Sequence, residues 1–352
     1  MFASVPTSIP SPPISWANIY IPLGWVHNII PGISDTYRLD IKTYALCLLA
    51  GMLVAVVFTS IRLTSRGGEP GRGLDIAIVA IVFGIIGARA YHVLTHWNDY
   101  FGPGKNTWNP FEPGAVWNIW DGGIAIFGSI IGGAIGIAIV CRVIGLRFWS
   151  YADVLVPALI IAQAIGRFGN YFNHELYGQP TTLPWGLQIE STNAAFPIGL
   201  PAGTLFQPTF LYEMIWDVLV MIALLLLERK FRLRWGKLAA LYFIFYGIGR
   251  VWFESIRIDP SVVFLGLRTN VWAALIAILI GLVVFIVQTR RHPGLEPSVY
   301  RPGREWVPDA STVDSDETYS DNDDDNDAVR KPDVPVTSAA ITGGTATSGA
   351  GV

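Results

Sequence analysis

The chain has 352 residues, of which 52% are hydrophobic and only 14% charged, and its mean hydropathy is +0.44. The net charge of −3 hides an asymmetry, because basic residues gather between apolar runs while acidic residues crowd the C-terminal end. This composition indicates a polytopic membrane protein and argues against a nucleic-acid partner. Cys47 and Cys141 lie in apolar runs, so we expect small apolar side chains rather than a disulfide or a metal pair.

Residues 1–42 lack a basic region followed by a compact apolar core, so we expect an extracytoplasmic N-terminal segment without a cleavable signal peptide. Residues 43–290 contain seven apolar stretches of the length that crosses a bilayer, which is roughly 20 residues for about 30 Å of hydrocarbon. The stretches are Tyr44–Arg62, Leu74–Leu94, Gly122–Cys141, Asp153–Phe168, Phe210–Glu228, Leu238–Phe253 and Asn270–Gln288. The sequence therefore predicts an all-α polytopic membrane protein with seven transmembrane helices.

Lysine and arginine are concentrated on one side of these stretches, and that side is expected to be cytoplasmic. The basic side holds Arg62, Arg66, Arg72, Arg142, Arg147, the stretch 228–237, Arg290 and Arg291. The opposite side holds Lys105, and no Lys or Arg occurs between Asn170 and Phe206. This distribution predicts an extracytoplasmic N-terminus and a cytoplasmic C-terminus.

Two polar segments flank the predicted helices. Residues from about 170 to 207 are too many and too polar for a plain loop, so we expect a small extracytoplasmic head. Residues 291–352 are rich in Pro, Ser, Asp and Gly and include the run DSDETYSDNDDDND. Such low hydrophobicity and dense negative charge cannot bury a core, which predicts a disordered cytoplasmic tail that is dispensable for activity.

The third stretch carries glycine every four residues, at Gly128, Gly132 and Gly136. These positions share one helix face. Small residues at this spacing let two helix backbones approach closely, so the pattern favours close helix packing over a catalytic role.

Two of the predicted helices carry a polar face that includes arginine. In the fourth, one face holds Gln163, Arg167, Asn170 and His174; in the sixth, one face holds Tyr246, Arg250, Glu254 and Arg257. An ionisable group near the hydrocarbon costs at least a few kcal/mol, so these faces should meet inside the protein or at a wet cavity. Two purely structural interpretations remain. Arg167 could extend its side chain to the membrane interface, and the sixth helix could hold an internal salt-bridge ladder.

Both arginines stand at a similar depth on the extracytoplasmic side. Paired guanidinium groups bind phosphate through planar, charge-assisted hydrogen bonds. At that depth the abundant phosphate belongs to a lipid headgroup, which points to a phospholipid substrate.

Five motifs occur in order between about residue 35 and residue 290: IKTYALCLLAG (41–51), WDGGIAIFGSIIGG (120–133), GRFGNYFNHELYG (166–178), QPTFLYE (207–213) and YGIGRVWFESIR (246–257). Together they resemble the motifs of the bacterial prolipoprotein diacylglyceryl transferase family. The resemblance implies a multi-pass enzyme of the bacterial plasma membrane without a cofactor or metal. It also implies transfer of the diacylglyceryl group from phosphatidylglycerol to the lipobox cysteine thiol of a prolipoprotein, which yields a thioether and glycerol phosphate.

The same resemblance implies roles for individual residues. Arg167 and Arg250 would bind the phosphate and stabilise the charge that develops as it leaves. The other positions that the motifs imply for substrate binding or catalysis are Tyr44, Asn170, Asn173, His174, Glu175, Gly178, Tyr246, Glu254 and Arg257. The chemistry suits a positive site, because a thiol with a pKa of about 8.5 must ionise before it attacks carbon.

The sequence departs from the family pattern at the expected general base. Phe127 and Gln207 stand where many members of the family carry histidine. His174, Glu254, Tyr246 and water are therefore candidates for the base, and the arginines alone could favour the thiolate.

Three other classes of protein fit part of the pattern. An anion transporter or channel also places arginine within the membrane, but no internal repeat is visible. An intramembrane protease would need a Ser/His or paired-Asp arrangement on facing helices. Another transferase with a phospholipid or polyprenyl-phosphate donor would use the same arginine pair.

Overall fold

The computed structural model describes residues 8–25, 29, 38–102, 108, 114–119 and 122–307. The chain divides into two units, Met1–Val307 and Pro308–Val352, and all elements below belong to the first. Lys105 and the acidic run of the predicted tail lie outside the described residues.

The described part of the chain is mostly helical and contains seven long helices. They are α1 (Thr43–Ser65), α2 (Arg72–Thr95), α4 (Ile126–Ile144), α5 (Phe148–Phe172), α6 (Thr209–Phe231), α7 (Lys237–Ile256) and α8 (Thr269–Arg291). A single-turn helix, α3 (Trp97–Tyr100), follows α2. Each predicted stretch falls on one long helix, although the third begins late. Gly122 and Gly123 have φ of 94° and 74°, which keeps them out of helix α4.

Six of these helices are long and apolar enough to cross a membrane: α1, α2, α4, α5, α6 and α8. Helix α7 is the exception among the long helices. Its twenty residues include Lys237, Arg250 and Glu254, and two of these charges belong to the site described below. A seventh span therefore does not follow from apolar length alone.

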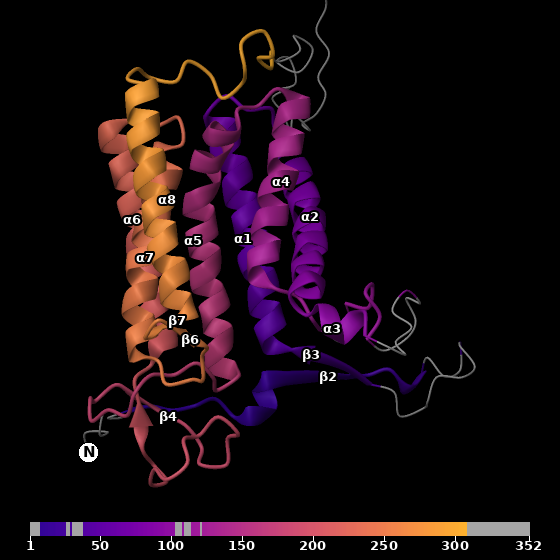
Figure 1. Ribbon diagram of the computed structural model, residues 1–352, viewed down its shortest axis with the longest axis vertical. Helices are drawn as coiled ribbons and strands as arrows, with labels where there is room; N and C mark the ends of the chain where they lie inside the picture. The colour runs from indigo at the N-terminus through magenta and orange to yellow at the C-terminus, as the bar shows by residue number, and fades with distance from the viewer. Residues whose placement is uncertain are drawn as a thin grey trace, which may run out of the picture. The chain divides into compact units, whose positions relative to one another are not determined.

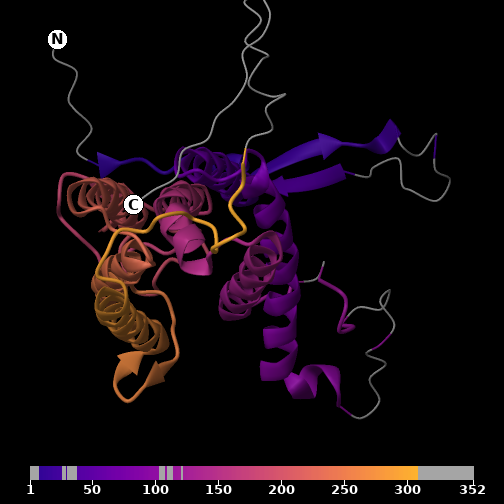
Figure 2. The ribbon, with the colours of Figure 1, turned by 90° about the horizontal axis from the view of Figure 1, so that it is seen from above.

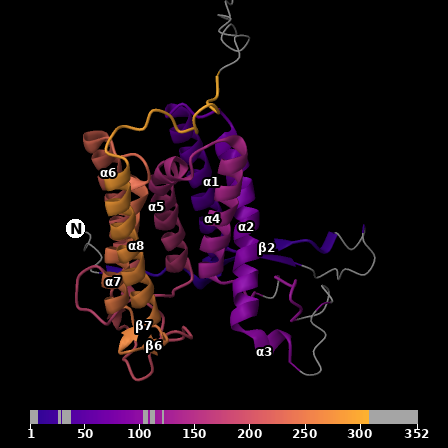
Figure 3. The ribbon, with the colours of Figure 1, turned by 45° about the horizontal axis from the view of Figure 1, so that its top comes forward.

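Helix α5 connects two groups of helices (Figure 1). On one side α1 packs against α5, while α2 packs against α4. On the other side α5 contacts α6 and α7, and α7 packs against α8. Figure 3 shows α5 between these groups. Side chains on one face of α5 can therefore reach α6 and α7.

Glycine allows the close contact between α2 and α4. A Cβ atom added at Gly128 would collide with the carbonyl oxygen of Gly87, and one at Gly132 with that of Phe83. The predicted glycine face is therefore a packing surface. Cys141, near the end of α4, is buried with Leu63 in a hydrophobic cluster, and neither cysteine forms a disulfide.

Short strands lie beside the helix ends and modify the all-α prediction. Strand β1 (Ser8–Ile9) pairs in parallel with β4 (Gly186–Gln188), which pairs antiparallel with β5 (Leu205–Phe206). Two antiparallel pairs lie elsewhere: β2 (Asn18–Pro22) with β3 (Arg38–Lys42), and β6 (Val263–Phe264) with β7 (Leu267–Arg268). A 3-10 turn, η1 (Ile14–Ala17), precedes β2. The polar segment after α5 has its own apolar cluster, formed by Tyr177, Leu187, Ile189, Phe206 and Phe210.

Residues 292–307, which we call the C-terminal strap, correct the prediction that disorder begins at residue 291. The backbone N–H of Arg147 donates to the carbonyl of Val299 at 2.9 Å, and that of Arg301 donates to Gly145 at 2.8 Å. Val299 and Tyr300 are buried in a cluster with Leu63. The apolar residues of the strap were overlooked because prolines and charges surround them.

Candidate active site

Arg167 of α5 and Arg250 of α7 meet at one carboxylate, that of Glu213 on α6. Arg167 Nε lies 2.6 Å from Glu213 Oε2, and Arg250 Nη1 lies 3.9 Å from the same oxygen. The carboxylate is buried, whereas 25% of the Arg167 side chain and 15% of the Arg250 side chain remain exposed. Three helices thus bring two guanidinium groups to one buried carboxylate.

One donor of this pair is free. Arg250 Nη1 is buried and has no hydrogen-bond acceptor among the described residues. The 3.9 Å separation from Glu213 is too long for a hydrogen bond. Because a buried donor without a partner is costly, this atom is suited to bind an oxygen from outside the chain.

Glu254 forms a second centre one turn after Arg250. Its fully buried carboxylate lies 3.0 Å from Arg250 Nη2, 3.0 Å from Arg268 Nε and 3.9 Å from Arg257 Nη1. Asn270 Nδ2 donates to Glu254 Oε1 at 3.0 Å. The salt-bridge ladder expected within the sixth predicted helix is therefore present, and it extends to α8. Its effect is to fix the Arg250 guanidinium through Nη2, whereas Glu213 lies nearest Nη1.

Asp259 completes the ionic network beyond the end of α7. Its two carboxylate oxygens accept from Arg257 Nε at 2.7 Å and Nη2 at 2.9 Å, and Arg268 Nη2 lies 3.1 Å away. Burial alone would raise the pKa of Asp259. The hydrogen bonds and positive charge of Arg257, assisted by Arg268, outweigh burial and lower this pKa below its ordinary value.

The C-terminal end of α5 and the residues just after it hold Arg167 through two amides and a carboxylate. Asn170 Nδ2 and Asn173 Nδ2 each donate to Glu175 Oε1 at 3.1 Å. Asn170 Oδ1 in turn lies 3.5 Å from Arg167 Nη1, at the limit of a hydrogen bond. The three predicted residues thus lie together and orient the guanidinium rather than point away from it.

His174 differs from its predicted position on the Arg167 face. Helix α5 ends at Phe172, and His174 adopts a left-handed backbone with φ of 50°, so the helical spacing no longer applies. Its buried ring donates to or accepts from Glu190 through Nδ1, at 2.8 Å. None of its contacts among the described residues is to either arginine.

Gly178 lies where the polar segment crosses the ends of α6 and α7. Its N–H donates to the carbonyl of Gln207 at 2.9 Å, and its backbone pairs with that of Arg257. An added Cβ would lie 2.8 Å from Ile256 Cγ2, which explains why the position needs glycine. Gln207 therefore contributes its backbone here.

The two predicted tyrosines lie on different helices. A Cβ added at Gly169 would lie 2.6 Å from Tyr44 Cδ2, so Tyr44 packs on the turn that carries Asn170. Tyr246 stacks on Tyr242, whose hydroxyl accepts from Gln163 Nε2 at 2.9 Å. Gln163 thus contacts α7 rather than Arg167.

Phe127 lies near the start of α4, and its ring packs 6.2 Å from that of Tyr91. The described residues show no contact between Phe127 and the arginines.

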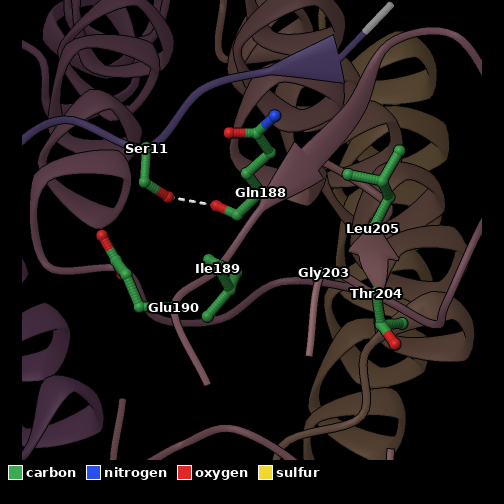
Figure 4. A pocket seen from close by; sticks show the side chains of 7 residues that line it. All are labelled: Ser11, Gln188, Ile189, Glu190, Gly203, Thr204 and Leu205. Carbon is green, nitrogen blue, oxygen red and sulfur yellow. Dashed lines mark hydrogen bonds between the residues drawn. The ribbon is translucent and has the colours of Figure 1, made fainter. Parts of the chain in front are cut away.

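A shallow pocket adjoins the turn after α5. Its lining residues are Ser11, Gln188, Ile189, Glu190, Gly203, Thr204 and Leu205. Figure 4 shows Ser11 and Glu190 on one side and Thr204 and Leu205 on the other, and the Ser11 hydroxyl donates to the Gln188 carbonyl. Because Glu190 also holds His174, the pocket is joined to the end of α5.

Sequence reasoning missed four members of the site: Glu213, Asp259, Arg268 and Asn270. Glu213 could have been found, because Glu213 and Asp217 are acidic residues one turn apart in a part of α6 that carries no other charge before Glu228. Arg268 follows the β6–β7 turn, and no helical spacing relates it to Glu254. Another buried arginine, Arg89 of α2, donates to the carbonyls of Ala115 and Val116 and so anchors a loop.

Comparison with known proteins gives one consistent result. Residues 31–287 match the family described as prolipoprotein diacylglyceryl transferase. A phosphatidylglycerol–prolipoprotein diacylglyceryl transferase of Leifsonia xyli subsp. xyli is 55% identical over 332 residues, which cover 92% of this chain and 96% of the relative. Proteins of the same name from Streptomyces griseus and Nocardia farcinica are 39% and 38% identical, over 81% and 94% of this chain and 84% and 70% of theirs. The matched range contains all the arginines of the site.

Proposed function

The chain belongs to the prolipoprotein diacylglyceryl transferase family, and we propose that it joins the diacylglyceryl group of phosphatidylglycerol to the lipobox cysteine of prolipoproteins through the Arg167–Arg250 pair. This is the first step of lipoprotein maturation. Membership of the family decides against the transporter and protease interpretations. It also selects phosphatidylglycerol over a polyprenyl phosphate as the donor.

The observation that carries the residue assignment is the free donor at Arg250. The phosphate of the donor lipid binds Arg250 Nη1 and the exposed part of the Arg167 guanidinium. The cysteine thiolate attacks the carbon of the diacylglyceryl group that is bonded to the phosphate oxygen. A C–S bond forms and the bond between this carbon and the phosphate oxygen breaks. Glycerol phosphate leaves with the electron pair, and the two arginines stabilise the charge that develops on it.

The other predicted site residues position this pair. Glu254 and Arg257 fix Arg250, and Asn170, Asn173 and Glu175 fix Arg167. Tyr44 packs against Gly169 in the last turn of α5, and Gly178 fixes the backbone that follows. The thiol needs no dedicated base in this scheme, because the positive field lowers the thiol pKa and water accepts the proton. His174 holds Glu190, and Tyr246 stacks on Tyr242.

We also propose the membrane orientation. Arg62 and Arg66 at the end of α1 and Arg234 before α7 all contact Glu228, at 2.7, 2.6 and 2.6 Å. Two basic segments, the end of α1 and the α6–α7 connection, thus meet at one end of the helices, opposite the end that carries Arg167, and this end is cytoplasmic by the positive-inside rule. Helix α7 is the seventh span, since neighbouring helices cover its charged face. The N-terminus is then extracytoplasmic, the C-terminus cytoplasmic, and residues 170–207 form the head.

The test is transfer of labelled diacylglyceryl from phosphatidylglycerol to a lipobox peptide in proteoliposomes. Arg167→Ala and Arg250→Ala should each lower the rate at least about 100-fold, as expected for loss of a charge-stabilising donor. Arg290→Ala removes an exposed arginine from the other end of α8 and should retain the wild-type rate. Normal transfer by either site variant would refute the phosphate clamp, and no transfer by the wild type would refute the assigned reaction.

A further inference from the structure

The β2–β3 ribbon has one polar and one apolar face. Its antiparallel register pairs Ile19 with Ile41 and Ile21 with Leu39. Because side chains alternate along a strand, these four apolar residues share one face. The other face carries Asn18, Tyr20, Pro22, Arg38, Asp40 and Lys42. The separation is complete over both strands.

The apolar face is uncovered within the described part of the chain. Ile19, Ile21 and Leu39 are 45%, 40% and 41% exposed. A two-stranded ribbon is at best marginally stable in water, so such a face needs another apolar surface. Figures 1 and 2 show the ribbon extending outward from the helices rather than back over them.

The base of the ribbon lies at the end of a membrane-spanning helix. Lys42, the last residue of β3, is the N-cap of α1, and α1 is long and apolar enough to cross a membrane. The Thr43 hydroxyl donates to the carbonyl of Trp16, which ties the two strands to the start of the helix. The ribbon therefore begins at the boundary between hydrocarbon and headgroups, and in Figure 1 it runs across the helix axes at that level.

The polar face fits lipid headgroups. Arg38 and Lys42 are basic, and the Arg38 guanidinium lies 4.7 Å from the centre of the Tyr20 ring. Tyrosine and tryptophan favour the membrane interface, and basic side chains are attracted to anionic headgroups. Trp16 and Trp25, which flank β2, are both exposed.

We propose that the β2–β3 ribbon lies in the outer headgroup layer of the bilayer, with Ile19, Ile21, Leu39 and Ile41 against the acyl chains and Arg38 and Lys42 against anionic headgroups. A second copy of the chain fits this apolar face less well than the bilayer does. Four side chains on two five-residue strands offer far less than the roughly 800 Å² per partner of a stable protein interface. The ribbon is an interfacial anchor beside the site, and this role does not depend on the proposed reaction.

The test compares neighbouring residues on opposite faces. Leu39→Cys and Asp40→Cys, each made with Cys47→Ala and Cys141→Ala, are labelled with an environment-sensitive fluorophore in phosphatidylglycerol-containing nanodiscs. Spin-labelled lipid should quench the label at 39 at least twofold more than the label at 40, and aqueous iodide should give the reverse order. Ile21→Cys and Tyr20→Cys repeat the comparison on the paired strand and cover the failure of one variant to fold.

Equal lipid quenching at the two faces would overturn the proposal, as would stronger quenching at 40 than at 39. Energy transfer between copies without lipid quenching would overturn it in favour of a second chain. The readout is independent of transfer activity, so an inactive but folded protein still tests it.

Discussion

Replacing Tyr300 with alanine tests whether the C-terminal strap is part of the folded membrane domain. Tyr300 is 3% exposed and packs in the cluster that joins α1, α2, α4 and α5. Its hydroxyl accepts the backbone N–H of Glu69 at 3.0 Å. Removing a buried aromatic side chain costs about 3–5 kcal/mol. At about 2 °C per kcal/mol, the value for the larger single domains, the expected loss in Tm is roughly 6–10 °C.

The measurement is thermal unfolding of the purified protein in detergent. Val307→Ala is the matched control, because Val307 belongs to the same strap but is 75% exposed. Its Tm should stay within about 1 °C of the wild type, as expected for a surface substitution. Equal shifts for the two variants would refute the reasoning.

Deleting residues 308–352 should leave transfer activity unchanged, whereas deleting 292–352 should lower Tm at least as much as Tyr300→Ala.

Three further predictions concern the site. Gly178→Ala should lower Tm and transfer rate together, because the new methyl group lies 2.8 Å from Ile256 Cγ2 and relief of such overpacking costs about 1–3 kcal/mol. Gly294→Ala, at an open position without a left-handed backbone, controls for the added methyl group. An unchanged Tm for Gly178→Ala would contradict the contact. Asp259 has a lowered pKa in the folded protein, so its stabilisation is complete above its ordinary pKa of about 3.9 and is lost as pH falls through the lower folded value. The Tm difference between wild type and Asp259→Asn should therefore stay constant from pH 7 to 5 and shrink only below about 4. A Tm difference that shrinks between pH 7 and 5 would show that the carboxylate is not held by Arg257. His174→Gln should leave the pH dependence of the transfer rate unaltered while lowering Tm, and loss of the acidic limb of that profile would identify His174 as the base.

The helices were predictable because their signal is continuous. Seven apolar stretches are visible without any knowledge of contacts, and each lies on a long helix. The polar faces of α5 and α7 were also predictable, since residues three or four positions apart share a helix face. The predicted position of His174 was wrong, because this spacing rule holds only within a helix and α5 ends two residues before His174.

Contacts between distant segments were not predictable from one sequence. Arg268 reaches Glu254 only because the β6–β7 turn folds back beside α7. The packing of Tyr300 against Leu63 depends on where the chain goes after α8. In both cases local composition gives no signal, because neither periodicity nor hydropathy encodes which loops lie side by side.

The position of Glu213 explains how two arginines can be held together at the proposed phosphate site. Guanidinium groups that converge on one position repel each other unless negative charge lies between them. Glu213 supplies that charge from a third helix, and it contacts Arg167 closely at 2.6 Å but Arg250 only at 3.9 Å. The carboxylate thus holds the pair together, and among the described residues Arg250 Nη1 has no hydrogen-bond acceptor. Because the donors are already oriented, little reorganisation is needed when charge develops on a leaving phosphate, which is the condition for strong electrostatic stabilisation.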